Sequence, residues 1–120
     1  MRRAYVHEAV VVLAAGGDVR ALGAAVTVAL CGHWDHEPPC PLAPHHTAVE
    51  PSTDARVRLR VLFAAEPAAE AEVRERIEAA LRGGALEGPD GVTTRWRPAG
   101  SRPGAIRPDE AEHAERLVRS

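Results

Sequence analysis

Residues 56–63 constrain the fold more than any other stretch, because arginine and apolar residues alternate along them with a period of two. Such alternation is typical of a strand that buries one face of an antiparallel sheet and exposes the other. We therefore expect a half-buried strand here. Its inward residues are Val57, Leu59, Val61 and Phe63, and its outward residues are Arg56, Arg58 and Arg60.

Two later segments have the 3.6-residue spacing of amphipathic helices. In residues 67–82, Pro67 suits a first helical turn, and Val73, Ile77 and Leu81 form one apolar stripe. Gly83 and Gly84 end this helix. In residues 109–119, Asp109 and Glu112 have the spacing of a capping box, but the apolar side is thin.

The remaining segments are assigned from apolar runs and turn residues. Residues 4–15 contain a Val-Val-Val-Leu run and predict a buried strand, on which His7 is a satisfied core or edge residue. Residues 92–97 predict a short strand, whereas the polar residues 47–54 and the Pro/Gly-containing residues 98–108 predict loops.

Residues 19–30 permit two interpretations. Asp18 could cap a helix, or residues 25–31 could form a strand returning beside the first. The β-branched run at 26–28 and Gly23 within the segment favour the strand. On that interpretation, Cys31 and His33 share one face of the strand.

The chain has 120 residues, which suits a single domain over 1–120. We predict an α+β fold, with a mainly antiparallel sheet of about four strands and two helices on one face, as in ferredoxin-like sandwiches. A Cys/His/Pro-rich loop would occupy residues 31–54. Open sheets of this kind often dimerise through an uncovered face or an edge strand, so a homodimer is expected.

Six potential metal donors gather within residues 31–46, where four prolines stiffen the backbone. Mixed thiolate and imidazole donors favour zinc, with copper or nickel next. The spacing is not that of a zinc finger. The predicted ligands are Cys31, His33, His36, Cys40, His45 and His46.

Three functions remain open for this loop. The first is a small metal-binding protein in which Cys31, His36, Cys40 and one of the two adjacent histidines hold zinc structurally. The second is a metal-dependent enzyme with an open coordination position and Asp35 or Glu37 as general base. The third is a dimeric interaction domain without metal, containing a Cys31–Cys40 disulfide.

Charge narrows the choice of partners. The formal net charge is −2, which gives no bulk attraction to nucleic acid or to membranes, and no partner of either kind is expected. Outward arginines could form one basic face if their strands are neighbours, but a solvated face is the favoured interpretation. They are Arg56, Arg58, Arg60, Arg95 and Arg97.

The N-terminus predicts a location. Arg2 and Arg3 precede an apolar run, but His7 and Glu8 interrupt the region that a signal peptide needs. We therefore expect a cytoplasmic protein, in which cysteines near histidines favour metal over a disulfide. No phosphate-binding loop or serine-hydrolase motif is present.

Overall fold

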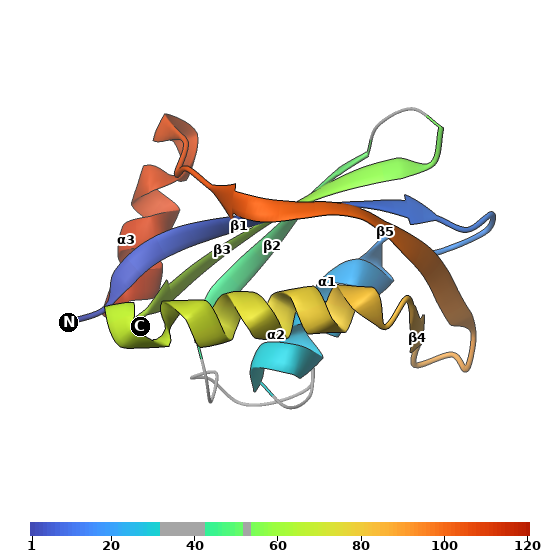
Figure 1. Cartoon of the computed structure of the whole chain (residues 1–120), viewed down its shortest axis with the longest axis horizontal. Helices are drawn as coiled ribbons and strands as arrows, with labels where there is room; N and C mark the ends of the chain where they lie inside the picture. Colours follow the sequence, from blue (N-terminus) through green and yellow to red (C-terminus); the bar gives the residue numbers. More distant parts are fainter. Residues whose placement is uncertain (32–42, 52–53) are drawn as a thin grey trace.

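The computed structural model describes residues 1–31, 43–51 and 54–120. Within them, five antiparallel strands form a curled sheet in the order β2-β3-β1-β5-β4, and three α-helices pack on it (Figure 1). The α+β class is thus confirmed. The elements are β1 (Arg3–Leu13), α1 (Arg20–Cys31), β2 (His45–Pro51), β3 (Arg56–Ala65), α2 (Glu70–Arg82), β4 (Ala85–Glu87), β5 (Thr93–Gly104) and α3 (Ala111–Arg119), with 3₁₀ turns at Pro67–Ala69 and Pro108–Glu110.

Strand β1 is the centre of the sheet, since it pairs with β3 on one side and with β5 on the other. Its pairing with β5 shifts register between Val10 and Val11, which are opposite Gly100 and Pro98. Ala99 is therefore the extra residue of a β-bulge. The bulge reverses which residues of β5 face the helices, because side chains alternate strictly along a regular strand.

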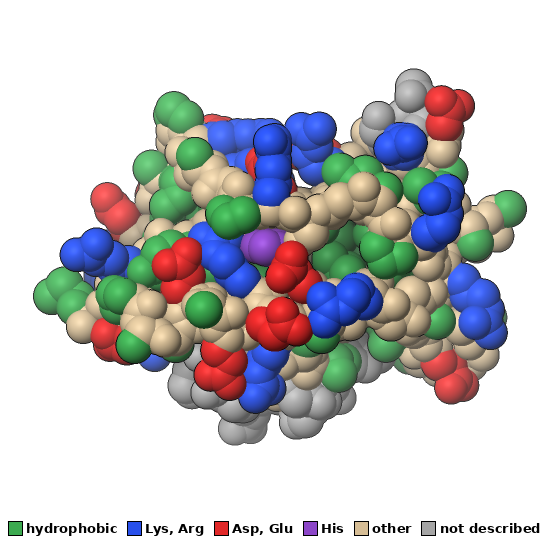
Figure 2. Space-filling view, viewed as in Figure 1, with side chains coloured by type: hydrophobic (Ala, Val, Ile, Leu, Met, Phe, Trp, Pro, Cys, Tyr) green, Lys and Arg blue, Asp and Glu red, His purple; other side chains and the backbone are tan. Residues whose placement is uncertain are grey.

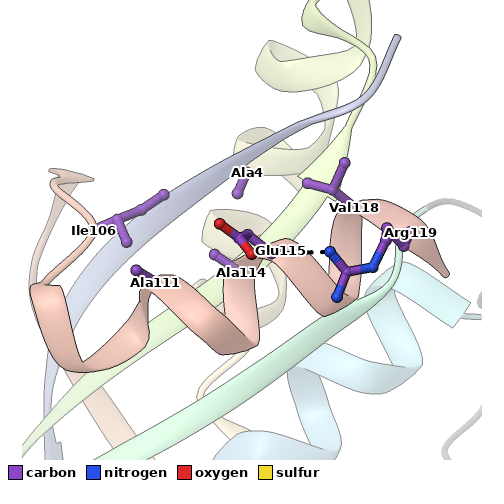
Figure 3. A pocket seen from close by; sticks show the side chains of 7 residues that line it. All are labelled: Ala4, Ile106, Ala111, Ala114, Glu115, Val118 and Arg119. Atoms are coloured by element: carbon purple, nitrogen blue, oxygen red, sulfur yellow. Dashed lines mark ion pairs between the residues drawn. The ribbon is translucent and has the colours of Figure 1, made fainter.

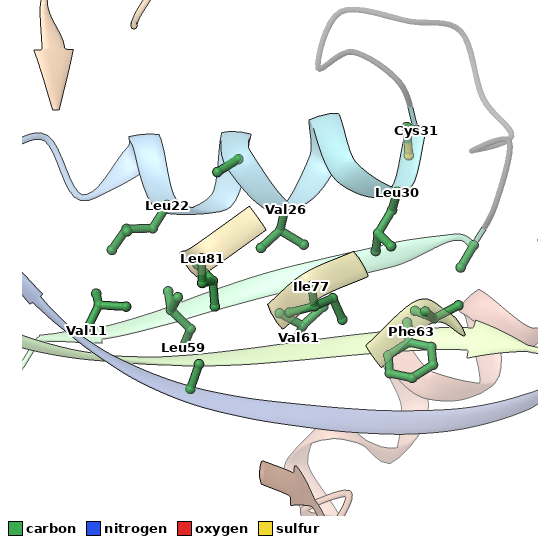
Figure 4. Packing of buried hydrophobic residues seen from close by; sticks show 14 of the residues in the cluster. Val11, Leu22, Val26, Leu30, Cys31, Leu59, Val61, Phe63, Ile77 and Leu81 are labelled. Atoms are coloured by element: carbon green, nitrogen blue, oxygen red, sulfur yellow. The ribbon is translucent and has the colours of Figure 1, made fainter. Parts of the chain in front are cut away.

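One face of the sheet carries the main core. The alternating residues of β3 point toward α1 and α2, as predicted, and meet the apolar faces of both helices (Figure 4). Helix α2 contributes the predicted stripe, in which Val73 and Ile77 are fully buried. Helix α1 contributes Leu22, Val26 and Leu30, at successive steps of four residues.

The opposite face has a smaller core under α3. Ala114 and Leu117 of α3 pack against Val6, Leu62 and Ala64 of the sheet. We predicted both amphipathic helices on one face, but only α2 lies there, together with the unpredicted α1. Helix α3 covers one end of the other face, because its thin apolar side matches this small patch. The 3₁₀ turn before it is capped by the backbone N–H of Arg107 donating to Glu110, not by the predicted pair Asp109 and Glu112.

The prediction of a strand over residues 25–31 was wrong. Local propensity favoured a strand, but Leu22, Val26 and Leu30 bury one helical face against the sheet, and that burial outweighs the cost of Gly23. Cys31 consequently ends a helix, so the expected sharing of a strand face with His33 does not arise.

Two loop predictions were also wrong in part, and one short strand was not predicted. Residues 45–51 form the edge strand β2, which pairs with β3 despite its polar sequence. Strand β5 continues through residues 98–104, where Pro98 adjoins the bulge and Pro103 lies beyond the short β4, on an edge of the sheet that tolerates proline. The three-residue β4, which we did not predict, extends the sheet beyond β5. No helix in the described part of the chain is long and apolar enough to span a membrane.

Candidate functional site

The end of α1 and the start of β2 bring two of the predicted metal donors together. Cys31 is buried in the last turn of α1, and its Sγ lies 3.8 Å from Nδ1 of His45. Both residues face the main core side of the sheet, because His45 pairs with Phe63 in the register of β2 and β3. Two donors from separate elements are therefore fixed side by side by the fold.

His45 is held by further contacts on both ring nitrogens. Its Nε2 lies 3.0 Å from Oγ1 of Thr27, and its Nδ1 also lies 3.2 Å from the carbonyl oxygen of Ala43. Only one neutral tautomer satisfies both oxygen contacts, because the carbonyl oxygen of Ala43 can only accept. With the proton on Nδ1, the ring donates to Ala43 and accepts from Thr27. With the proton on Nε2, the ring donates to Thr27, but Nδ1 no longer donates to Ala43 and its lone pair faces that carbonyl oxygen.

His46 lies on the opposite face of the sheet from His45, as consecutive strand residues must. Its ring stands against that of His113 in α3, with centroids 4.8 Å apart. Burial, followed by the charges of His46 and Arg116, lowers the pKa of His113. His113 is half-buried in this pair. The structure thus separates His46 from Cys31.

The described residues contain no group of three or more His, Cys, Asp or Glu side chains arranged to hold a metal ion. The other predicted ligands, His33, His36 and Cys40, lie outside the described residues, as do the candidate bases Asp35 and Glu37. Cys31 itself is disulfide-bonded and so is not a free thiol in this structure. A disulfide sulfur is not the thiolate that zinc requires.

A second polar cluster surrounds His7, which is buried on β1, as expected for a core histidine. Nη1 of Arg74 donates to Nδ1 of His7 at 3.1 Å, and Nε2 of His7 lies 2.6 Å from Oγ of Ser101. Because arginine only donates, Nδ1 accepts and the proton sits on Nε2. Ser101 then receives that hydrogen bond and donates its own proton to Glu78 at 2.9 Å.

This tautomer determines what the His7 cluster can do. A histidine that donates from Nε2 cannot take a proton from Ser101, so the cluster is not a nucleophile–base pair. Burial, and then the charge of Arg74, lowers the pKa of His7 and keeps the ring neutral. No motif in the sequence signals this cluster, because its members come from three separate elements.

Arg60 forms the centre of an ion-pair network beneath α3. We predicted an outward, solvated arginine, but its side chain is only 2% exposed. It pairs with Glu8, donates to both carboxylate oxygens of Glu110 at 2.6 and 2.9 Å, and donates to the carbonyl oxygen of Ala105 at 2.8 Å. The hydrogen bonds from Arg60 are the main cause of the lowered pKa of Glu110.

Two hollows lie away from these clusters. One, of about 320 Å³, is an apolar groove between β1 and α3, crossed at one side by the Glu115–Arg119 ion pair (Figure 3). The other, of about 570 Å³, lies between the start of α1 and the turn after β4, and it includes Asp18, Arg20 and Asp90. Neither hollow contains a predicted site residue.

Comparison of the chain with models of protein families, with curated proteins and with solved structures gives no match.

Proposed function

We propose that the protein is a small metal-binding protein in which Cys31 and His45 supply the first two donors to a zinc ion. The observation that supports this proposal is the 3.8 Å separation of Sγ and Nδ1. Tetrahedral zinc, with its usual Zn–S and Zn–N bonds, holds such donors roughly 3.6 Å apart. The pair is therefore spaced for a shared ion without movement of the backbone.

Thr27 supports the same proposal from the second nitrogen of the ring. Metal-bound histidines commonly donate their other N–H to an oxygen, which fixes the tautomer and the ring orientation. The contact of 3.0 Å between Nε2 and Oγ1 of Thr27 would serve this purpose. Zinc would compete for Nδ1 with the carbonyl oxygen of Ala43, so binding requires the tautomer with the proton on Nε2.

The proposal concerns the reduced chain. Cys31 must be a thiolate to bind zinc, so two-electron reduction of its disulfide must come first. Further ligands would come from His33, His36 and Cys40, and His46 is left out of the set because it faces α3. The number of protein ligands distinguishes the two kinds of site: a structural zinc site has four, whereas a catalytic site leaves one position open.

The oxidised state of Cys31 favours a second candidate function, a dimeric interaction domain that binds no metal. In that case the disulfide ties the end of α1 into place and thereby fixes the adjoining surface. The two candidates differ in whether reduction creates a metal site.

The adjacent histidines provide a matched test. The chain is reduced with a phosphine, loaded with zinc, desalted and analysed by plasma mass spectrometry. We expect about one zinc per chain in the wild type, a large loss in Cys31→Ser and His45→Ala, and no loss in His46→Ala. Equal loss in the two histidine variants would contradict the proposed ligand set. No zinc in the reduced wild type would leave the interaction domain as the better candidate.

We propose a ferredoxin-like sandwich extended by β4 and α3. The order β2-β3-β1-β5 of four antiparallel strands, together with the packing of α1 and α2 on one face, supports it.

A further inference from the structure

Arginines of β3 and β5 flank β1 on the sheet face that α3 leaves open. Val12 of β1 pairs with Arg56 of β3 on one side and with Arg97 of β5 on the other. One step along, Val10 pairs with Arg58 and with Gly100. We use the term arginine face for the exposed side chains that border this strip, namely Arg56, Arg58, Arg95, Arg97 and Arg102.

Most of this positive charge has no partner within the described residues. There, no carboxylate lies within 4.0 Å of the guanidinium groups of Arg56, Arg58, Arg95 or Arg97. The acidic neighbours are already engaged: Glu8 pairs with Arg60 and Arg102, and Glu50, directly opposite Arg58, pairs with Arg107 at 2.8 Å. In a chain of net charge −2, one face is thus strongly basic.

The arginines border an apolar floor. Val10 and Val12 are only half-buried, and Gly100 adds no side chain beside them. A hollow of about 180 Å³ opens at Gly100, with Arg58, Arg102 and Glu8 around it. Figure 2 shows basic side chains gathered on the side of the molecule away from α1 and α2. The face therefore offers a shallow strip with charged borders.

We propose that the arginine face docks an extended acidic peptide segment of a partner protein, with carboxylates at alternate positions. Side chains two residues apart on a strand are about 6.7 Å apart, so Arg56 and Arg58, and likewise Arg95 and Arg97, match alternate carboxylates of an extended peptide. The side chains between the carboxylates would point away from the sheet. Charge complementarity then gives both the steering and the register.

The face suits a peptide better than a single-stranded nucleic acid. Sequence-tolerant nucleic acid grooves add aromatic rings on which bases stack. Among the described residues, Tyr5 and Phe63 lie against Arg74 of α2, and Trp96 donates to the carbonyl oxygen of Leu81. All three rings therefore face the helices and leave the arginine face without a stacking platform. A second copy of the chain would bring like charges together.

Fluorescence anisotropy with a labelled peptide of about ten residues, alternating glutamate and threonine, tests the proposal. The variant Arg58→Gln/Arg97→Gln should weaken binding about tenfold at low salt. The control Arg76→Gln/Arg82→Gln removes the same charge from exposed, ion-paired positions of α2, and we expect less than about a twofold change. Unfolding temperatures verify that both variants fold.

Two comparison probes make the result specific. A peptide of the same composition with its glutamates in one block should bind more weakly than the alternating peptide. An oligothymidylate of equal charge should bind no better than the alternating peptide. The proposal is overturned if the control variant loses as much affinity as the test variant, if the block peptide binds equally well, or if the wild type shows no saturable binding. Tighter binding of the oligothymidylate would assign the face to nucleic acid instead.

Discussion

Replacing Arg60 by alanine should be one of the most damaging single changes outside the apolar core. The guanidinium is 2% exposed, and its partners Glu8 and Glu110 are 13% and 17% exposed, so the substitution leaves two largely buried carboxylates behind. Removing one partner of a buried ion pair typically costs about 3–5 kcal/mol. Glu8 keeps Arg102, and Glu110 keeps the backbone N–H of Arg107, so we expect the lower end, about 3 kcal/mol.

Urea titration followed by far-UV circular dichroism at neutral pH measures this loss. Arg58→Ala is the matched control, because it removes an exposed arginine two residues away on the same strand. It should change the free energy of unfolding by less than about 0.5 kcal/mol. A loss below about 1 kcal/mol for Arg60→Ala would mean that water reaches the two carboxylates and that the network is not a buried one.

The loss of stability at acidic pH gives an independent check on the same network. Arg60 lowers the pKa of Glu110 below its usual 4.5 in the folded chain. A carboxyl of this kind contributes stability above its unfolded pKa and loses it as the pH falls through the folded pKa. The Arg60→Ala variant should therefore lose less stability than the wild type between about pH 5 and pH 3. An equal loss of stability in the two proteins over this pH range would contradict this role of Glu110.

Three further predictions concern the helices and His7. Gly23→Ala should stabilise the chain by about 0.5–1 kcal/mol in urea titration, because a Cβ there would meet Thr47 at 3.8 Å, an ordinary contact; a loss would mean that α1 needs glycine for packing. Ile77→Asp should abolish the cooperative thermal transition by burying an unpaired charge, whereas Ala79→Asp on the exposed side of α2 should keep it. Because the pKa of His7 is lowered in the folded chain, stability is full above about pH 6.5 and falls as the unfolded chain takes up the proton. His7→Gln should reduce the fall in unfolding temperature between pH 7 and pH 5, and an unchanged fall would contradict a neutral, buried His7.

The sequence predicts those elements in which local pattern and tertiary environment agree. In α2 the period of 3.6 residues is clear because the helix buries one face only. In β3 the alternation marks a strand correctly, although from Leu59 onward α3 and the ion-pair network bury its second face as well. In α1 the two disagreed: β-branched residues suggested a strand, while the spacing of Leu22, Val26 and Leu30 was already helical. The packing of α1 against α2 and the sheet decided between them.

The sequence predicted which segment holds the candidate site better than it predicted which side chains come together there. The six donors were grouped because they are close in sequence. Residues 47–54 were assigned to a loop, so the opposite orientations of His45 and His46 were not expected. Once residues 45–51 are a strand, His45 and His46 must face opposite ways, and only His45 can approach Cys31. The clusters around His7 and Arg60 could not be predicted, because they depend on pairings between strands that are distant in sequence.

The bulge at Ala99 divides β5 into two parts, in which odd-numbered and even-numbered residues face opposite sides of the sheet. Before it, Trp96 points to the core and Arg97 points out; after it, Ser101 points to His7 and Arg102 points to Glu8. In a chain lacking Ala99, side chains would alternate without interruption along β5. Either Trp96 and Arg97 or Ser101 and Arg102 would then face the wrong side of the sheet. Insertions and deletions within residues 98–100 should therefore be tolerated far less than substitutions, even though the side chains there are exposed.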